Sequence, residues 1–315
     1  MACTIRELAA ACGVSIATVS KALHRSERIS EATIRLVEEK AKELGYVGSG
    51  AARALVKGER KIAVLLPDSA LYGERYRVGI QRAERHLLAH GITVSRTAPE
   101  QTEGYDALLS HPLLVPCLPE GEERPVATLG TRVLSYRPTV EVSPDYRVGG
   151  RLASQFLAFS TGGSSVAVLV SRRGSYAEEE SVRGFRELSA RLGVTVVAVS
   201  EVGDTARSVG VELRRLLIRH PRLKGLFVAS PIVGTVTAAL GEYRKRITVV
   251  GADFTKMAQE ALRTGGAAAL LYPSPEKQAE EALYALCDRL NGQRKDGLIT
   301  VRQELVLKSN LESYF

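Results

Sequence analysis

From Lys61 onward, short apolar segments alternate with segments of helical periodicity, and this alternation constrains the fold more than any other feature. Short apolar strands separated by helices predict a parallel β-sheet that is covered by helices on both faces. A chain of 315 residues is also long enough for more than one domain. The expected strands are KIAVLLP, ITVSRTA, SVAVLVS, VTVVAVS, KGLFVAS, ITVVGAD and AAALLYP, and the expected helices are ERYRVGIQRAERHLLAHG, SVRGFRELSARLG and EKQAEEALYALCDRLNG.

Composition excludes several classes of protein. Apolar residues make up 45% and charged residues 25% of the chain, as in ordinary globular proteins. No apolar run approaches the roughly 18 residues that span a bilayer, and the first ten residues do not resemble an export signal, so we expect a cytoplasmic protein with no membrane association. No C-x-x-C pair occurs and no histidine is expected at metal-ligand spacing, which favours reduced structural thiols at Cys3, Cys12, Cys117 and Cys287.

Three short helices are predicted before residue 46. Thr4 and Glu7 form a T-x-x-E capping box, and Ser15 and Ser30 are placed to cap a second and a third helix. Gly13 and Gly45 follow the first and third helices, as expected at helix ends. The apolar positions recur at helical spacing and predict one small core, made of Ile5, Leu8, Ala9, Val19, Leu23, Ile34, Val37, Ala41 and Leu44.

The outward face of the second helix is unusual, because it carries small and hydroxyl-bearing residues where a solvated helix normally has Glu and Lys. Residues 1–61 also hold eleven Lys and Arg against seven Glu, about half of the net charge of +8 of the whole chain. A helix with free N–H groups and hydroxyls at its amino end suits phosphate contact while its tip enters a major groove. This face, which we expect to lie against DNA, consists of Ile16, Ala17, Thr18, Ser20 and Lys21.

The stretch TIRELAAACGVSIATVSKAL, with the ISEAT and LGY stretches that follow it, resembles the helix-turn-helix headpiece of the LacI/GalR bacterial transcription regulators. The resemblance covers about 55 residues. It implies a sequence-specific repressor that binds a near-palindromic double-stranded DNA operator as a homodimer. It also implies base-reading roles for Ile16, Ala17 and Lys21, with Lys21 standing where Arg is commoner, so that the two-pronged guanidinium contact to guanine is absent. The positions implied to hold the phosphate backbone are Thr4, Ser15, Thr18, Ser20, Arg28, Ser30, Thr33 and Tyr46.

The composition of residues 48–60 predicts a linker, because two glycines and several small residues precede a basic end. In the resembling family this segment becomes a hinge helix on the operator, and a Leu wedges into a base step of the minor groove. The resemblance places Leu55 at the wedge and Ala52 beside it. Gly48 and Ser49 replace the usual Pro-Asn pair, which predicts a looser hinge; the alternative is that Leu55 is merely an apolar linker residue.

The remaining chain, residues 61–315, resembles the two-lobed periplasmic-binding-protein-like sensor of the same family, with a small polar effector in the interlobe cleft. Asp253 matches the acidic residue that holds sugar hydroxyls in the family. Ser181 replaces an effector-anchoring Arg, and Ser230 and Pro231 replace an Asn-Asp pair, so the effector is either unusual or absent. Expected strand ends supply the other candidate contacts, which are Asp68, Ser69, Tyr72, Arg172, Phe254 and Tyr272.

The first lobe is expected to lack one helix, since ITVSRTAPEQTEG runs directly into YDALLSHPLL. Proline removes the donors of a strand ladder, which predicts irregular strands instead of a regular βαβ unit in this part of the lobe. The prolines concerned are Pro112, Pro116, Pro119, Pro125 and Pro138.

Catalysis is not expected. The STGGSS stretch at 160–165 lacks the spacing of a phosphate-binding loop and is better explained as a turn between helix and strand. No nucleophile motif or carboxylate pair surrounds the histidines, so no catalytic residue, metal or cofactor is predicted. The expected architecture is therefore a small all-α headpiece (1–47), a hinge linker (48–60) and an α/β two-lobed domain with parallel sheets (61–315). A soluble solute-binding protein and an α/β enzyme are the less favoured alternatives.

Overall fold

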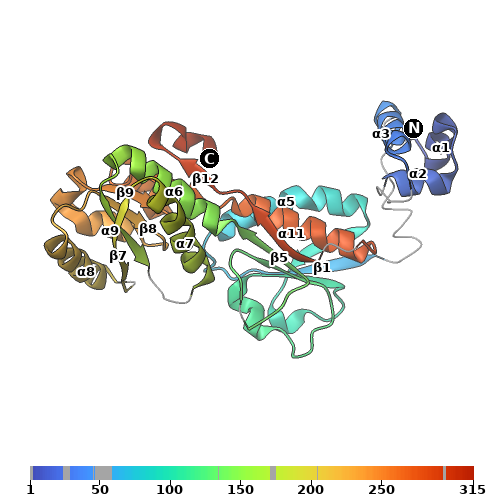
Figure 1. Ribbon diagram of the computed structural model, residues 1–315. Helices are drawn as coiled ribbons and strands as arrows, with labels where there is room; N and C mark the ends of the chain where they lie inside the picture. The colour runs from blue at the N-terminus through green and yellow to red at the C-terminus, as the bar shows by residue number, and fades with distance from the viewer. Residues whose placement is uncertain are drawn as a thin grey trace.

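The computed structural model describes residues 3–23, 29–44, 46, 59–133, 135–170, 175–203, 205–293 and 296–315. The first three helices form a bundle of their own around Leu8, Val19 and Val37, which are fully buried. Figure 1 shows this bundle in blue. Its helices are α1 (Ile5–Cys12), α2 (Ile16–Leu23) and α3 (Glu31–Glu43).

The capping signals predicted from the sequence are present. The Thr4 hydroxyl accepts a hydrogen bond from the N–H of Glu7, and the Glu7 carboxylate accepts one from the N–H of Thr4. Gly13 ends α1 with a φ of 63°, a left-handed conformation that glycine adopts without steric cost. Leu44, an expected core residue, is instead 43% exposed, because α3 ends at Glu43 and the helical spacing no longer applies.

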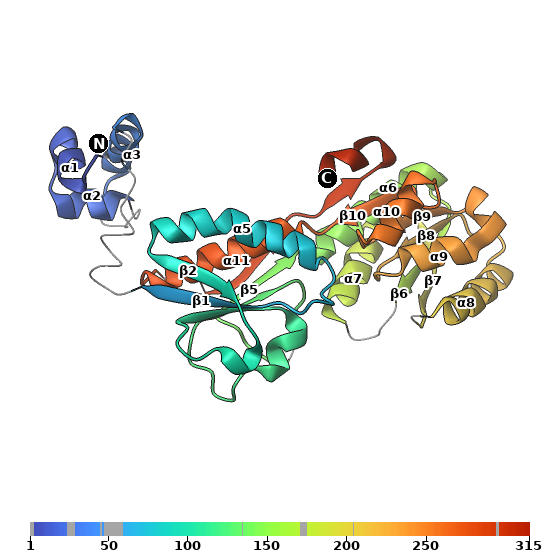
Figure 2. The same ribbon diagram turned by 180° about the vertical axis from the view of Figure 1, so that it is seen from behind.

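The first lobe is a six-stranded parallel sheet with the strand order β11-β5-β4-β3-β1-β2. Figure 2 shows α5 and α11 together on one face of this sheet. The opposite face carries Ala63, Leu108 and Val126 beneath Tyr105, Leu118 and Tyr136 of the connecting segments. The elements are β1 (Arg60–Leu65), α5 (Gly73–Ala89), β2 (Ile92–Arg96), β3 (Ala107–Ser110), β4 (Val126–Leu129), β5 (Val140–Pro144), α11 (Pro275–Leu290) and β11 (Gly297–Val301).

The proline-rich part of this lobe is partly as expected. Only a 3-10 turn, η1 (Pro99–Gln101), lies between β2 and β3, so the lobe lacks a helix there, as predicted. The prediction of irregular strands is wrong, however, because β3 and β4 are regular, parallel and buried along their whole length. The prolines lie outside both strands: Pro112 and Pro116 fall in the 3-10 helix η2 (Pro112–Cys117), and Pro119, Pro125 and Pro138 fall in loops.

The second lobe is a six-stranded sheet with the order β12-β10-β9-β8-β6-β7, parallel except for the edge strand β12. One face packs against α6 and α7, and the other against α8, α9 and α10. The elements are α6 (Tyr146–Thr161), β6 (Ser165–Val170), α7 (Tyr176–Arg191), β7 (Thr195–Glu201), α8 (Ala206–Arg219), β8 (Gly225–Val228), α9 (Val233–Leu240), η3 (Gly241–Lys245), β9 (Thr248–Gly251), α10 (Lys256–Arg263), β10 (Ala269–Tyr272), β12 (Glu304–Val306) and η4 (Lys308–Tyr314).

The chain passes between the lobes three times, after β5, after β10 and after β11. Two of these crossings are joined by a hydrogen bond from the N–H of Asp145 to the carbonyl of Val301, 3.1 Å long. Pro144, Pro273 and Gln303 lie on the three crossings and line one cavity. The crossings therefore bring residues of both lobes to a common cleft.

Two glycines allow α6 and α7 to pack closely. A Cβ on Gly150 would lie 2.0 Å from the carbonyl oxygen of Ser181, and a Cβ on Gly184 would lie 1.9 Å from that of Arg147. The RGF stretch therefore requires glycine for this contact, which also fixes the first turns of α7 beside the cleft. In the part of the chain that the structure describes, no helix is both long and apolar enough to cross a membrane.

Candidate functional site

The first candidate site is the exposed face of α2. Val19 and Ala22 are buried in the core of the headpiece, which fixes the rotation of the helix. Ala17 and Lys21 are consequently exposed, and Ile16 is 44% exposed although it is large and apolar. An apolar side chain, a small one and a cation on one short face suit base edges in a groove, because apolar contacts read the thymine methyl and Lys donates to guanine.

Two hydroxyl pairs stand at the amino ends of α2 and α3. Ser15 Oγ accepts from the N–H of Thr18 and lies 2.8 Å from the Thr18 hydroxyl. Ser30 and Thr33 repeat this arrangement, also at 2.8 Å. Within each pair one hydroxyl donates to the other, so one hydroxyl proton per pair is left to donate to a phosphate oxygen. The pairs therefore combine helix capping with two donors at positive helix ends.

The other expected phosphate contacts are placed differently. The Thr4 hydroxyl donates to the Glu7 carboxylate at 3.0 Å, so its proton is already engaged in the capping box, and the bonds from Thr4 lower the pKa of Glu7. Ser20 is half-buried, and Tyr46 packs against the headpiece core. Arg28, Ala52, Leu55 and Arg172 lie outside the described residues.

The second candidate site is a cleft of about 660 Å³ between the lobes. Four of the residues expected to contact an effector line it, namely Ser69, Tyr72, Ser181 and Asp253. Ser230 is buried behind the wall and donates a hydrogen bond to Glu178, which does line the cleft. The structure thus places four of the nine expected residues on the lining of this cleft and Ser230 behind it.

Asp253 is 1% exposed, and its carboxylate already has three donors. Oδ2 accepts from the N–H of Val233 at 3.2 Å, and Oδ1 accepts from the N–H and the hydroxyl of Thr255 at 3.0 and 2.7 Å. These bonds hold the starts of α9 and α10 beside the cleft. Burial raises the pKa of Asp253 and the three donors oppose that rise. A carboxylate has about four lone-pair sites, so one more donor fits.

The floor of the cleft contains polar side chains that no sequence motif marks. The amide nitrogen of Gln278 donates to the carbonyl of Pro273 at 2.7 Å, and the Tyr146 hydroxyl donates to the carbonyl of Gly130 at 2.9 Å. Gln303 is 6% exposed, and its buried Oε1 has no hydrogen-bond partner among the described residues. A buried acceptor without a donor is costly, and this oxygen lies against Gly149 near the start of α6.

A cation and a histidine also line the cleft. Arg132 pairs with Glu141 at 3.1 Å, and its guanidinium lies 4.9 Å from the centroid of the Tyr176 ring. His111 Nδ1 accepts from the N–H of Leu113 at 3.3 Å, and burial lowers the pKa of His111 to about 4. Arg132 is far in the sequence from Ser181, the position where the resembling family has an Arg. No local sequence pattern therefore indicates that an arginine lies in the cleft.

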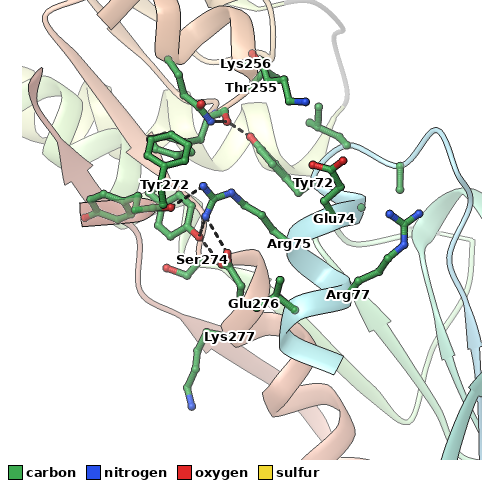
Figure 3. A pocket seen from close by; sticks show the side chains of 18 of the residues that line it. Tyr72, Glu74, Arg75, Arg77, Thr255, Lys256, Tyr272, Ser274, Glu276 and Lys277 are labelled. Carbon is green, nitrogen blue, oxygen red and sulfur yellow. Dashed lines mark hydrogen bonds and ion pairs between the residues drawn. The ribbon is translucent and has the colours of Figure 1, made fainter. Parts of the chain in front are cut away.

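Asp68, Phe254 and Tyr272 lie outside this cleft, in a second pocket of about 1040 Å³ that Ser69 and Tyr72 also border. Figure 3 shows Arg75 directed at Tyr272 and Glu276 there. Arg75 donates to the Tyr272 hydroxyl and to Glu276 at 2.9 and 2.8 Å. The side chain of Asp68 is 87% exposed and pairs with Arg96 at 2.7 Å. These three residues therefore do not face the same space as Asp253.

Comparisons with known proteins match both the headpiece and the two-lobed part of the chain. Residues 4–49 match the family described as bacterial regulatory proteins, lacI family, and residues 117–294 match a periplasmic binding protein domain. The HTH-type transcriptional regulator CelR of Thermobifida fusca is 30% identical over 98% of this chain and 96% of its own length. The HTH-type transcriptional repressor PurR of Edwardsiella ictaluri is 26% identical over 96% and 95%. The crystal structure of AraP, an arabinose binding protein from Geobacillus stearothermophilus, has a TM-score of 0.71 at 18% identity and covers 82% of this chain and 99% of its own.

Proposed function

Because this chain belongs to the LacI family of bacterial regulatory proteins and is a DNA-binding transcriptional regulator, not an enzyme, we propose that it acts in the cytoplasm as a homodimeric repressor. Its operator is a near-palindrome, and its affinity for that operator changes when a small sugar-like molecule occupies the interlobe cleft. No cofactor or metal takes part in the regulation proposed here.

The exposed face of α2 supports the DNA-reading part of the proposal. Ile16, Ala17 and Lys21 face away from the headpiece core, and the hydroxyl pairs of Ser15 and Ser30 lie at helix ends where phosphate is favoured. One such headpiece makes few base contacts. A two-fold dimer places two reading helices about 34 Å apart, roughly one helical turn, which accounts for a near-palindromic operator.

An apolar surface on the second lobe supports the dimer. Ile218 of α8 and Met257 of α10 are 77% and 60% exposed, and Tyr243 and Val211 nearby are also large and exposed. Ile218, Tyr243 and Met257 border a hollow together with Ala238 and Ala239 of α9. Exposed apolar groups gathered over three helices are typical of a surface that another protein covers. A second copy of this chain is the occupant we propose.

The observation that carries the effector proposal is the set of polar side chains that lines the cleft, Gln303 among them. Asp253, with one lone-pair site left, and Glu178 offer further acceptors, while Arg132 and His111 offer donors. A molecule with several adjacent hydroxyls satisfies such a set better than an apolar one does. Because Ser181 cannot form the two charge-assisted bonds of an Arg, sugars that suit typical relatives are expected to bind weakly.

A thermal-shift screen of the full-length protein tests this proposal. Sugars, polyols, sugar phosphates and sugar acids are added singly, because a ligand that binds only the folded state raises the melting temperature. Each hit is then added to a protein–operator complex, and we expect a changed operator affinity. If no compound shifts the melting temperature, the alternative holds that the cleft is degenerate and the regulator responds to no sugar.

A further inference from the structure

Two histidines and a cysteine meet where α5 and α11 end. His86 lies in the last turn of α5 and His90 is its C-cap residue, four positions later. Cys287 lies on α11, which packs against α5 in the core of the first lobe. No metal site is predicted from the sequence, and only the fold brings Cys287 next to His90, which precedes it by 197 positions.

The ligand atoms of these three side chains all lie within 4.8 Å of one another. The two imidazole rings are 4.7 Å apart between centroids, as expected for an i, i+4 pair on one helix face. In a tetrahedral zinc site, bonds of about 2.0–2.3 Å place ligand atoms roughly 3.5 Å apart. Closure therefore requires a shift of about an ångström, which the exposed ring of His86 can make by rotating.

We propose that His86, His90 and Cys287 form a binding site for a divalent transition metal ion of the zinc class. Two imidazole nitrogens and one thiolate favour Zn²⁺ or Co²⁺, whereas Mg²⁺ and Ca²⁺ prefer oxygen ligands. The three side chains fill three of four tetrahedral positions and leave the fourth to water or another small ligand. Because the thiol must lose its proton, affinity for the metal rises with pH.

The surroundings hold the donors in place. Cys287 is 1% exposed and is not in a disulfide, and Asn291 Nδ2 donates to its sulfur at 3.5 Å. The same Asn291 accepts from Arg60 at 3.0 Å, and Arg60 also donates to the carbonyl of His90 at 3.2 Å. The ring of Tyr284 lies edge-on to His86, with centroids 4.9 Å apart. Such contacts orient metal ligands in the way that outer-shell partners do.

The proposed metal site lies next to Arg60, at the start of β1. Arg60 opens β1, the first strand after the linker, and its guanidinium bonds to the ends of both helices. A metal ion at this cluster therefore links α5 to α11 beside Arg60, the first residue of β1. This inference concerns the lobe alone and does not rest on the effector or dimer proposals.

Titration of Co²⁺ into the metal-free, full-length protein tests the site. We expect one equivalent to bind with a thiolate-to-cobalt charge-transfer band, and Zn²⁺ to displace it. His86→Ala, a change at an exposed residue that spares the core, is expected to weaken binding by at least about tenfold, since even outer-shell changes cost that much. Cys287→Ser is expected to abolish the band.

Matched controls are His220→Ala in the second lobe and Cys117→Ser at an exposed thiol, both of which are expected to bind like the wild type. Circular dichroism verifies that every variant is folded. The absence of a charge-transfer band in the wild type, its survival in Cys287→Ser, or equal affinity in the wild type and His86→Ala would each overturn the proposal.

Discussion

The hydroxyl oxygen of Tyr72 accepts a 3.0 Å hydrogen bond from the backbone N–H of Phe254. Tyr72 precedes the first helix of one lobe, and Phe254 follows Asp253 in the other, so this bond joins the lobes at the edge of the cleft. Tyr72 also has a φ of 66°, a left-handed conformation that costs a bulky residue about 1–3 kcal/mol.

Tyr72→Phe removes the acceptor and leaves the N–H of Phe254 without a partner. We expect the free energy of unfolding to fall by about 1–3 kcal/mol, the cost of a buried unsatisfied group. Urea denaturation measures this change in the free energy of unfolding. Tyr105→Phe, which breaks an exposed side-chain bond to Ser95, is the control and should cost less than about 0.5 kcal/mol. Equal losses in the two variants would mean that the hydrogen bond between the lobes stabilises the fold no more than an exposed side-chain bond does.

Asp253→Asn is expected to act on folding as well as on effector binding. The amide nitrogen cannot accept from the N–H of Val233, so we expect a loss of about 1–3 kcal/mol in the free energy of unfolding. Affinity for any hit of the thermal-shift screen should fall too, while effector-free operator binding stays nearly unchanged. The control Asp106→Asn alters a carboxylate that accepts one bond from Lys61 at the surface. Undiminished ligand binding by a folded Asp253→Asn variant would show that Asp253 does not contribute to effector binding.

His111 predicts a specific pH dependence. The unfolded chain takes up a proton on this histidine below its ordinary pKa of 6.5, whereas the folded protein does so only near its pKa of about 4. Stability therefore decreases as the pH falls from 6.5 toward 4, by at most about 1.4 kcal/mol per pH unit. His111→Asn removes this contribution, so its stability should fall less than that of the wild type between pH 7 and 5. Parallel stability curves for the two proteins would contradict the prediction.

Gly184→Ala tests the close contact of α6 with α7. The added methyl group would lie 1.9 Å from the carbonyl oxygen of Arg147, so the helices must separate, and overpacking of this kind costs about 1–3 kcal/mol. Gly210→Ala in α8 is the control with the opposite sign, because nothing lies within 4 Å of its Cβ. It should stabilise the protein by about 0.5–1 kcal/mol, as Ala does in place of Gly within a helix. Melting temperatures that move in the same direction would contradict the packing described.

Local signals predicted the headpiece well, because capping at Thr4 depends on neighbours within one turn and the helical spacing of apolar residues marks Val19 for the core between the three helices. The cleft was harder to predict. Asp253 and Phe254 follow the same strand, yet successive side chains leave a strand on opposite sides. Asp253 accordingly faces the cleft and Phe254 the second pocket. Gln303 and the cluster around Cys287 acquire their surroundings only from chain crossings and helix packing, to which no sequence motif corresponds.

The central claim is that α2 reads base sequence, and Lys21→Ala tests it most directly. An operator is first selected from a random duplex library with the full-length wild-type protein, and two half-sites in near-palindromic arrangement should emerge. The affinities of the wild type and of Lys21→Ala for this operator and for a scrambled duplex are then measured at one fixed salt concentration, with Arg186→Ala on α7 as a control that removes one exposed charge far in the sequence from the headpiece.

We predict that Lys21→Ala weakens operator binding by about 1–3 kcal/mol and changes binding to the scrambled duplex far less, because a base contact is lost. Equal weakening on both duplexes, or equal affinity of the wild type for both, would contradict the account.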